Sequence, residues 1–377
     1  MKNTNLFPFF CVLLPKITKQ MTLHIFNPEH DIALAANLSN FTAPHAGRQL
    51  RYDLCFLPAL WAKEGDGVLV DNPERAQNSY KHFLHSVSRQ FGKSFHLVKC
   101  PRWEQAVTPA ETTAIQPWGW DLALRSQLKR IGADASLLPT DDAIAAIRQL
   151  SHRRTSAELL PQLRFEGTVG ESFECTTADE TVPLLQRYDR LVLKAPWSSS
   201  GRGLRFIRRD APVAQTAGWL RNLLTAQGSV MAEPFYDKVK DFGMEFECSS
   251  EGKVNYLGLS LFHTANGAYT GNLLATEKVK QDILSRYISI DLLHSVIEKI
   301  CQLSAVIFKG RYVGPFGVDM MVVRGTDGCL LHPCVEINLR RTMGHVALSL
   351  TPDDDDIQRV MQIDYSDNRY HLRIIKP

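Results

Sequence analysis

The sequence predicts an α/β (α+β) fold built from two parts of different texture. Residues 21 to about 150 alternate short strands with helices, and such alternation indicates a small open parallel sheet. From about residue 151 onward, longer strands and glycine-rich loops accompany one strongly amphipathic helix at about 290–308. With 377 residues, 44% of them hydrophobic and 22% charged, the chain is long enough for two or three globular domains.

The elements of the first part are delimited by short apolar runs and by helix-start signals. The strands are expected at 22–26, 68–71 and 95–98, and the helices at 73–91, at 122–131 and from Asp141 onward. In the second part, the apolar residues that predict the core-facing side of helix 290–308 are Leu292, Leu293, Val296, Ile297, Ile300 and Val306.

Composition excludes several classes of protein. A net charge of +3 with mixed signs gives no indication of a nucleic-acid or membrane surface. No apolar run of about 18 residues is present, so no transmembrane span is expected. The eight cysteines form no C-x-x-C pair and no zinc-ligand spacing, which favours a reducing, cytoplasmic location. We interpret residues 1–20 as a disordered or spurious extension, with a signal sequence as the alternative.

The most informative segment is a hairpin formed by residues 318–323 and 335–338. Asp327-Gly328 is the preferred two-residue hairpin turn, because both of its residues must accept positive φ. Counting outward from this turn, 326 pairs with 329, 323 with 332 and 319 with 336. Asp319 and Glu336 therefore lie opposite each other, and Asn338 lies on the same face.

Two carboxylates and an amide on one face of an apolar hairpin require a cation between them. Asp319, Glu336 and Asn338 supply hard oxygen ligands of the kind that Mg²⁺ prefers, with Mn²⁺ as the alternative ion. The alternative interpretation is a solvated outer face of an edge hairpin. Pro333 also indicates an irregular ladder near the turn, because proline donates no hydrogen bond.

The second informative segment places a lysine at the end of a buried strand. Lys194 follows the apolar run 191–193, and a loop rich in small residues comes next, formed by Ser198, Ser199, Ser200, Gly201, Arg202 and Gly203. Small residues let backbone N–H groups approach phosphate oxygens, and the lysine supplies a fixed positive charge. Neither a P-loop nor a G-x-G-x-x-G motif is present. The alternative is a flexible hairpin loop with a solvent-directed lysine.

The third segment is an apolar strand that ends in Glu233 and Pro234, followed by Phe235 and Tyr236. A second strand, 242–247, carries Glu245. Two such strands can frame a flat purine slot, in which the backbone contacts the base and a carboxylate contacts the ribose hydroxyls.

These three segments, in this order, resemble the ATP-grasp superfamily and cover about residues 150–350. The resemblance implies ATP and Mg²⁺ as cofactors and a preceding Rossmann-like domain at 21–150. It divides residues 151–377 into a small ATP-binding subdomain (151–235) and a C-terminal subdomain with the metal site (236–377).

The resemblance also implies roles for basic residues, with alternatives left open. Arg153 or Arg154 takes the place of an additional phosphate-binding lysine, and Arg340 or Arg341 faces the γ-phosphate. Lys278 or Lys280 covers that phosphate. Residues 263–272 form either a lid or an ordinary surface loop. Residues 27–31 end the first strand, where open α/β sheets bind ligands, but Asp31 equally suits a helix cap.

The function implied is an ATP-dependent ligase that joins a small-molecule carboxylate to an amine through an acylphosphate. The alternatives are an ATP-grasp kinase and a non-catalytic nucleotide-binding protein. The sequence identifies neither substrate, and it allows a homodimer without indicating one.

Overall fold

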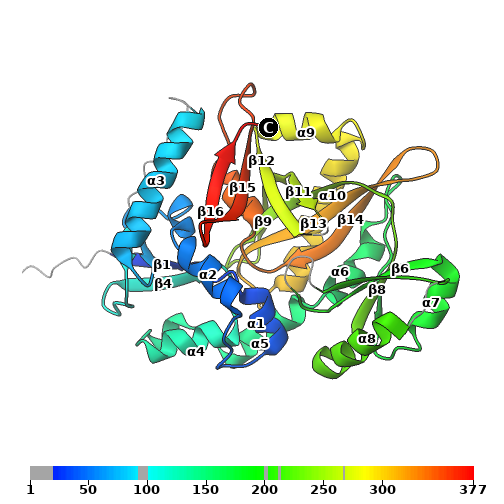
Figure 1. The fold of residues 1–377 in the computed structure, drawn as a ribbon, viewed down its shortest axis with the longest axis horizontal. Helices are drawn as coiled ribbons and strands as arrows, with labels where there is room; N and C mark the ends of the chain where they lie inside the picture. The colour runs from blue at the N-terminus through cyan, green and yellow to red at the C-terminus, as the bar shows by residue number, and fades with distance from the viewer. Residues whose placement is uncertain (1–19, 92–100, 199–202, 211–213, 266–267) are drawn as a thin grey trace, which may run out of the picture.

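The computed structural model describes residues 20–91, 101–198, 203–210, 214–265 and 268–377 (Figure 1). The extension at 1–19 and the strand expected at 95–98 lie outside these residues. The described chain forms four four-stranded sheets, one parallel and three antiparallel, with helices packed between and around them. No helix of the described residues has both the length and the apolar character needed to cross a membrane.

The first part of the chain forms the expected parallel sheet, in the order β3-β2-β1-β4. Its strands are β1 (Met21–Ile25), β2 (Gly67–Leu69), β3 (Arg102–Glu104) and β4 (Thr112–Pro117). The helices of this part are α1 (His30–Ala36), α2 (His45–Asp53), α3 (Pro73–Phe91), α4 (Leu122–Arg130) and α5 (Asp141–Leu150), with the 3₁₀ segments Leu57–Leu60 and Ala135–Leu137.

A second, small sheet in the order β5-β8-β6-β7 follows and brings Lys194 to a strand end. Its strands are β5 (Phe173–Cys175), β6 (Arg190–Lys194), β7 (Leu204–Arg208) and β8 (Val230–Pro234). The accompanying helices are α6 (Arg154–Leu159), 3₁₀ segment Leu160–Leu163, α7 (Thr181–Tyr188) and α8 (Ala214–Gln227). Leu191 and Leu193 are buried on one face of β6 against α7 and α8 residues, so alternation places the side chain of Lys194 on the opposite face.

The third sheet, β10-β9-β13-β14, carries the predicted metal hairpin. It comprises β9 (Lys238–Cys248), β10 (Val254–Ser260), β13 (Gly314–Arg324) and β14 (Cys329–Asn338). Helices α9 (Glu277–Leu284) and α10 (Ile290–Phe308) belong to the same subdomain. The largest core of the molecule lies between this sheet and α10, where Phe246 stacks on Phe316 at 5.1 Å between ring centroids and Phe308 meets Phe316 edge-on.

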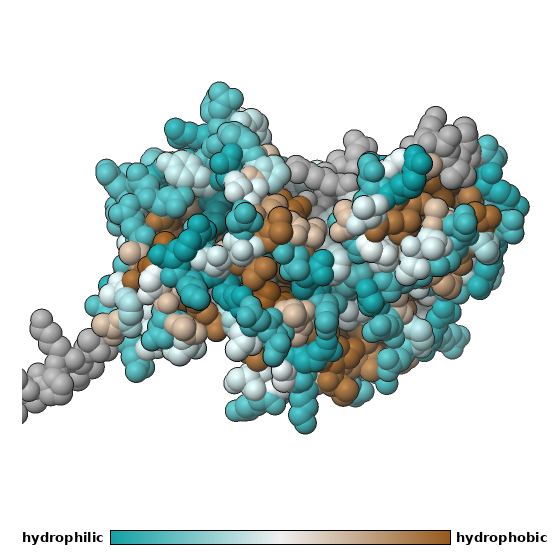
Figure 2. All heavy atoms as spheres, turned by 90° about the horizontal axis from the view of Figure 1, so that it is seen from below, coloured by the Kyte–Doolittle hydropathy of each residue, from teal (hydrophilic) through white to brown (hydrophobic). Residues whose placement is uncertain are grey.

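The chain ends in a fourth sheet, β11-β12-β15-β16, that packs on the first part of the chain (Figure 1). Its strands are β11 (Phe262–Ala265), β12 (Ala268–Leu274), β15 (Arg359–Ser366) and β16 (Arg369–Ile375), and α11 (Met343–Leu348) precedes β15. Leu372 and Ile374 of β16 share a core with Phe83 and Val87 of α3. Seen from below, the surface shows separate hydrophobic patches among hydrophilic side chains (Figure 2).

The β13–β14 hairpin confirms the pairing of Asp319 with Glu336, but the predicted turn is wrong. At its tip Arg324 pairs with Cys329, and the loop therefore has four residues, 325–328. Asp327 does not have the positive φ that a two-residue Asp-Gly turn needs, whereas Gly328 does, at 149°.

The register along this hairpin changes beside Pro333. Val323 pairs with Leu330 instead of residue 332, and Met321 takes residue 332 as its partner. Between there and the Asp319 pair, one residue of β13 faces three residues of β14. Proline has no N–H to donate to the ladder. The irregularity at Pro333 therefore marks the point where the register near the turn changes to the register that pairs Asp319 with Glu336.

Two other expectations are corrected by the structure. Val306 does not lie on the core face of α10, since it is 76% exposed whereas Leu293, Val296 and Ile300 are buried. The segment 263–272 is not a loop, because its described residues form the antiparallel strands β11 and β12.

The burial of α10 gives a stability prediction with an internal control. We expect Val296→Ala to lower the free energy of unfolding by about 2 kcal/mol, because two methyl groups leave a filled core. Val306→Ala, the same substitution on the exposed side of the helix, should change it by less than about 0.5 kcal/mol. Urea unfolding of the two variants measures the difference, and equal effects would contradict the burial pattern.

Candidate functional site

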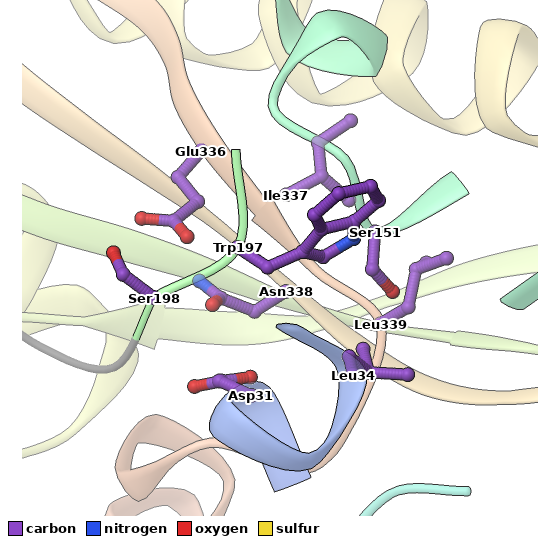
Figure 3. Close-up of a pocket in the computed structure, with 9 residues that line it drawn as sticks. All are labelled: Asp31, Leu34, Ser151, Trp197, Ser198, Glu336, Ile337, Asn338 and Leu339. Atoms are coloured by element: carbon purple, nitrogen blue, oxygen red, sulfur yellow. The ribbon is translucent and has the colours of Figure 1, made fainter. Parts of the chain in front are cut away.

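Two neighbouring strands bring three oxygen-bearing side chains together. Asp319 on β13 lies opposite Glu336 on β14, and the Asn338 amide donates a hydrogen bond to Asp319 Oδ2 at 3.3 Å. A small hollow beside them is lined by Glu336, Asn338, Asp31 and Ser198, whose oxygen atoms face the same space (Figure 3). The hollow thus joins the third sheet, the loop after β6 and the start of α1.

The electrostatics of this hollow favour a cation. Burial raises the pKa of Asp319 to about 8, and the nearby Glu336 and Glu245 carboxylates contribute. Arg340 and Asn338 act in the opposite direction but do not outweigh them. Asp319 therefore keeps a proton at neutral pH unless positive charge is added beside it. Two carboxylates and an amide oxygen suit Mg²⁺; the described residues contain no group of three His, Cys, Asp or Glu side chains arranged for a metal.

Arg153 is the arginine that reaches the hollow. Its guanidinium is buried and donates to Glu336 Oε2 at 2.7 Å, to Ser198 Oγ at 3.0 Å and to the carbonyl of Ala195. Arg154 instead pairs with Glu174 at 3.0 Å, and its side chain is 48% exposed. Of the two arginines that the sequence left as alternatives, Arg153 therefore contacts residues of the hollow, whereas Arg154 lies at a half-exposed position beside Glu174.

Arg340 connects the hollow to the first part of the chain. It holds Asp31 bidentately, at 2.7 and 2.8 Å, and also donates to Asn338 Oδ1 at 3.0 Å. Burial opposes the charge of Arg340, but Asp31 and the other carboxylates outweigh it and raise its pKa. Asp31 does not cap α1, as the helix-cap interpretation expected, because it lies within the first turn.

Arg341 points elsewhere, over the ring of Trp61 at 4.7 Å. Burial lowers its pKa to about 10. Of the two arginines that follow β14, only Arg340 contacts the residues of the hollow in the described structure.

Lys194 forms a buried ion pair with Glu233 on the adjacent strand β8. The Nζ–Oε2 distance is 2.5 Å, and Ser172 donates to the other oxygen of Glu233 at 3.2 Å. Gly203 packs directly on Ser198, where a Cβ atom would overlap the hydroxyl group. Ser199, Ser200 and Gly201 lie outside the described residues.

The segment after β8 is lined with aromatic side chains. Pro234 ends β8, and Phe235 packs beneath the guanidinium of Arg190, 3.7 Å from its ring centroid. Tyr236 meets His332 edge-on, with 5.5 Å between the rings. Both aromatic rings therefore already have packing partners in this structure.

Three further candidates have other partners in this structure. Glu245 accepts a hydrogen bond from Thr342 Oγ1 at 2.8 Å and pairs with His345 at 2.9 Å, so it supports the start of α11. Lys278 is 74% exposed and pairs with Asp355 at 2.8 Å. Lys280 is buried and donates to the carbonyl of Leu259 at 2.9 Å. None of the three lines the hollow.

Sequence reasoning missed two residues that line the hollow. Ser151 precedes the arginine pair, and its hydroxyl is buried with no hydrogen-bond partner among the described residues. Trp197 precedes the serine loop and donates its indole N–H to the carbonyl of Arg148 at 2.9 Å. Neither residue belongs to a pattern that could have indicated a site.

The raised pKa of Asp319 predicts a pH-dependent effect on stability. Above about pH 4 an unfolded aspartate loses its proton, whereas folded Asp319 keeps it up to about pH 8. The contribution of Asp319 to the free energy of unfolding therefore falls as the pH rises from about 4 to about 8. We expect Asp319→Asn to gain stability over the wild type between pH 5 and pH 8 in the presence of EDTA.

Urea unfolding at the two pH values measures this gain. Asp353→Asn, at an exposed position, is the control and should differ from the wild type equally at both pH values. A gain of Asp319→Asn that is the same at pH 5 and pH 8 would contradict the assignment.

Solved structures of known proteins resemble this chain, whereas known sequences do not. No protein-family model matches the chain, and no curated protein has a similar sequence. N5-carboxyaminoimidazole synthetase from Staphylococcus aureus, complexed with ADP, has a TM-score of 0.50 and 12% identity over 94% of this chain and 84% of that chain. The biotin carboxylase domain of the Hydrogenobacter thermophilus 2-oxoglutarate carboxylase, complexed with MgADP, ADP and bicarbonate, has a TM-score of 0.53 and 12% identity over 92% and 75%. These similarities confirm the architecture that the sequence motifs implied: the chain has the ATP-grasp fold.

Proposed function

We propose that the protein is an ATP-dependent ligase that joins a carboxylate to an amine. The observation that carries the proposal is that Glu336 and Asn338 line one hollow and that Asp319, Arg153 and Arg340 each contact one of these two residues. Such a set of alternating anionic and cationic groups suits a metal-bound polyphosphate, since the metal needs oxygen ligands and the phosphates need fixed cations.

The nucleotide would lie between the second and third sheets. Lys194 and Arg153 would contact its phosphates, and the backbone of the serine loop at 198–203 would surround them. Glu233, Pro234, Phe235 and Tyr236 would border the adenine. Binding would require Lys194, which now pairs with Glu233, to exchange that carboxylate for a phosphate oxygen.

Asp319, Glu336 and Asn338 would hold Mg²⁺, which when bound neutralises charge on the β- and γ-phosphates. The raised pKa of Asp319 supports this assignment, because it shows that the negative charge of the buried carboxylate is unfavourable until a cation takes the place of the proton. Arg153 keeps the Glu336 carboxylate fixed in position, and Arg340 does the same for the Asn338 amide.

The proposed reaction has two steps. A carboxylate oxygen of the substrate attacks the γ-phosphorus, the bond to the β-phosphate oxygen breaks, and ADP leaves. An amine then attacks the acyl carbon of the acylphosphate, loses a proton, and displaces inorganic phosphate to give the amide. Arg340 would stabilise the charge on the transferring phosphoryl group. It is suited to this role because its contacts with Asp31 and Asn338 hold its guanidinium beside the proposed metal ligands.

A cytoplasmic location is part of the proposal. The six cysteines among the described residues are all free, which suits a reducing compartment.

The decisive experiment measures ADP release by the purified protein with Mg-ATP, against pools of amines and of small carboxylates that include bicarbonate, with and without hydroxylamine. We expect carboxylate-dependent ADP release and hydroxamate formation. Asp319→Ala and Glu336→Ala should each reduce turnover by about 100-fold or more. Asp327→Ala, in the loop of the same hairpin, is the control and should retain full turnover.

Other outcomes separate the alternatives. A stable phosphorylated product without hydroxamate would identify a kinase instead. ATP binding without turnover in any pool would indicate a non-catalytic nucleotide-binding protein, and absence of ATP binding would refute the proposal.

The two neighbouring arginines provide a matched test of nucleotide binding. Arg153→Met should weaken ATP binding by about tenfold or more, because it removes a buried charge-assisted donor beside the phosphates. Arg154→Met should change ATP affinity less than about twofold, since its guanidinium pairs with Glu174 at a half-exposed site. Isothermal titration with Mg-ATP measures both, and equal losses would contradict the assignment of Arg153.

A further inference from the structure

Helix α1 carries Asp31, the carboxylate that holds Arg340 beside the proposed metal ligands, but the helix does not fix its own start. It has only seven residues, and helices this short are unstable in isolation. Glu29 at the N-cap makes no side-chain hydrogen bond to the first turn and pairs instead with Arg51 of α2 at 2.8 Å. The position of Asp31 therefore depends on the contacts of α1 with other parts of the chain.

A buried polar network joins the start of α1 to the loop that follows β4. His30, the first residue of α1, donates from Nδ1 to Asp121 Oδ2 at 3.4 Å. The side chain of Asn27 donates to the carbonyl of Gly119 at 2.8 Å and to Asp121 at 3.2 Å. The carbonyl of Asn27 accepts the backbone N–H of His30 at 3.2 Å. The network thus connects the carboxyl ends of β1 and β4 with the first residue of α1.

The ring of His30 fits against this loop because residue 119 is a glycine. A Cβ atom at Gly119 would lie 2.7 to 2.8 Å from three atoms of the ring, which is closer than nonbonded heavy atoms approach. His30 and Asp121 are each 1% exposed, and Nε2 of His30 has no partner among the described residues. Asp121 is therefore the side chain that orients the ring in the described structure.

The network reaches the hollow through Asp31, which directly follows the first residue of α1 and faces the hollow (Figure 3). Asp31 accepts two hydrogen bonds from Arg340, at 2.7 and 2.8 Å, and Arg340 also donates to Asn338 Oδ1 at 3.0 Å. The other end of α1 is held separately, where Arg148 donates to the carbonyl of Leu34 at 2.8 Å. A shift at the start of α1 would therefore move Asp31 and, with it, the guanidinium of Arg340.

We propose that His30 and Asp121 are positioning residues for Arg340 and that they act through Asp31. This role rests on the proposed function, because it takes Arg340 as the residue that faces the γ-phosphate. A guanidinium that is fixed in advance loses little conformational freedom when it contacts a phosphate, so the contact contributes more to affinity. The network should therefore affect the binding of the γ-phosphate more than the binding of the rest of the nucleotide.

The test is isothermal titration of the full chain with Mg-AMP-PNP, a non-hydrolysable analogue of ATP, and with Mg-ADP. The ratio of the two affinities measures the contribution of the γ-phosphate. Two variants of one residue form a matched pair, because the amide nitrogen of asparagine takes the place of Nδ1 of histidine and that of glutamine takes the place of Nε2. We expect His30→Gln, which loses the contact with Asp121, to lower the preference for AMP-PNP about tenfold. His30→Asn should keep it within about twofold.

Two further variants guard this result against a general loss of stability. Asp121→Asn keeps an oxygen atom that can cap α4 but weakens the bond to His30, so it should lower the preference in the same direction. His24→Asn breaks another buried histidine–aspartate pair of the same sheet, in which His24 Nε2 lies 3.1 Å from Asp66. This pair is not part of the network, and the preference should remain unchanged.

A double-mutant cycle decides whether His30 acts through Asp31. In the Asp31→Asn background, His30→Gln should change the preference less than about twofold, because the link to Arg340 is already weakened. A full tenfold change in that background would overturn the proposal, and so would equal effects of His30→Gln and His30→Asn in the wild-type background.

These measurements need no turnover, so they separate the positioning role from the ligase reaction. The expected pattern of preferences in a protein that forms no amide would support the positioning role while the proposed function fails. Amide formation by a protein whose preference does not respond to His30→Gln or Asp121→Asn would overturn the positioning role alone.

Discussion

The site depends on two acidic side chains that adjacent strands hold opposite each other. Asp319 and Glu336 cannot both carry a charge in this partly enclosed place without nearby cations. Arg153, which precedes the second sheet, and Arg340, which follows β14, meet this requirement only in part, since the pKa of Asp319 stays raised to about 8 beside them. Arg340 also forms an ion pair with Asp31 of α1. The charges around this one strand pair therefore connect α1, the segment at Arg153 and the β13–β14 hairpin, which are far apart in the sequence.

The fold also joins its two ends. The last strands, β15 and β16, complete a sheet with β11 and β12, yet their apolar side chains share a core with α3 from the first part of the chain. Tyr370 donates its backbone N–H to Asp53 of α2 at 2.9 Å across this junction. The division of the chain at residues 150 and 235 remains a prediction. The C-terminal strands do not follow it, because they pair with β12 of the second part and also pack on α3 of the first part.

What could be predicted from the sequence follows from local periodicity. Counting along the strands placed Asp319 opposite Glu336 only because the four-residue loop and the irregularity beside Pro333 shift the register by equal and opposite amounts, whereas the helical repeat gave the limits of α10 directly. The irregular ladder expected at Pro333 is confirmed, but the size of its register shift was not predicted, and the exposure of Val306 was missed, because the packing partner of a helix depends on distant parts of the chain. The same reason explains why Arg153 and Arg154 could not be told apart: adjacent residues on a helix start differ only in what surrounds them.

The ion pair between Lys194 and Glu233 gives the resting site an internal counterion. A buried lysine without a partner would attract any anion in solution, or lose its proton. Here Glu233 competes for the same ammonium group, so only a ligand with several further contacts gains by displacing it. In the proposed reaction the pair would re-form as ADP departs, and this return to a neutral pair would favour release of the spent nucleotide. Glu233 would then raise the selectivity of the empty site and also promote product release after turnover.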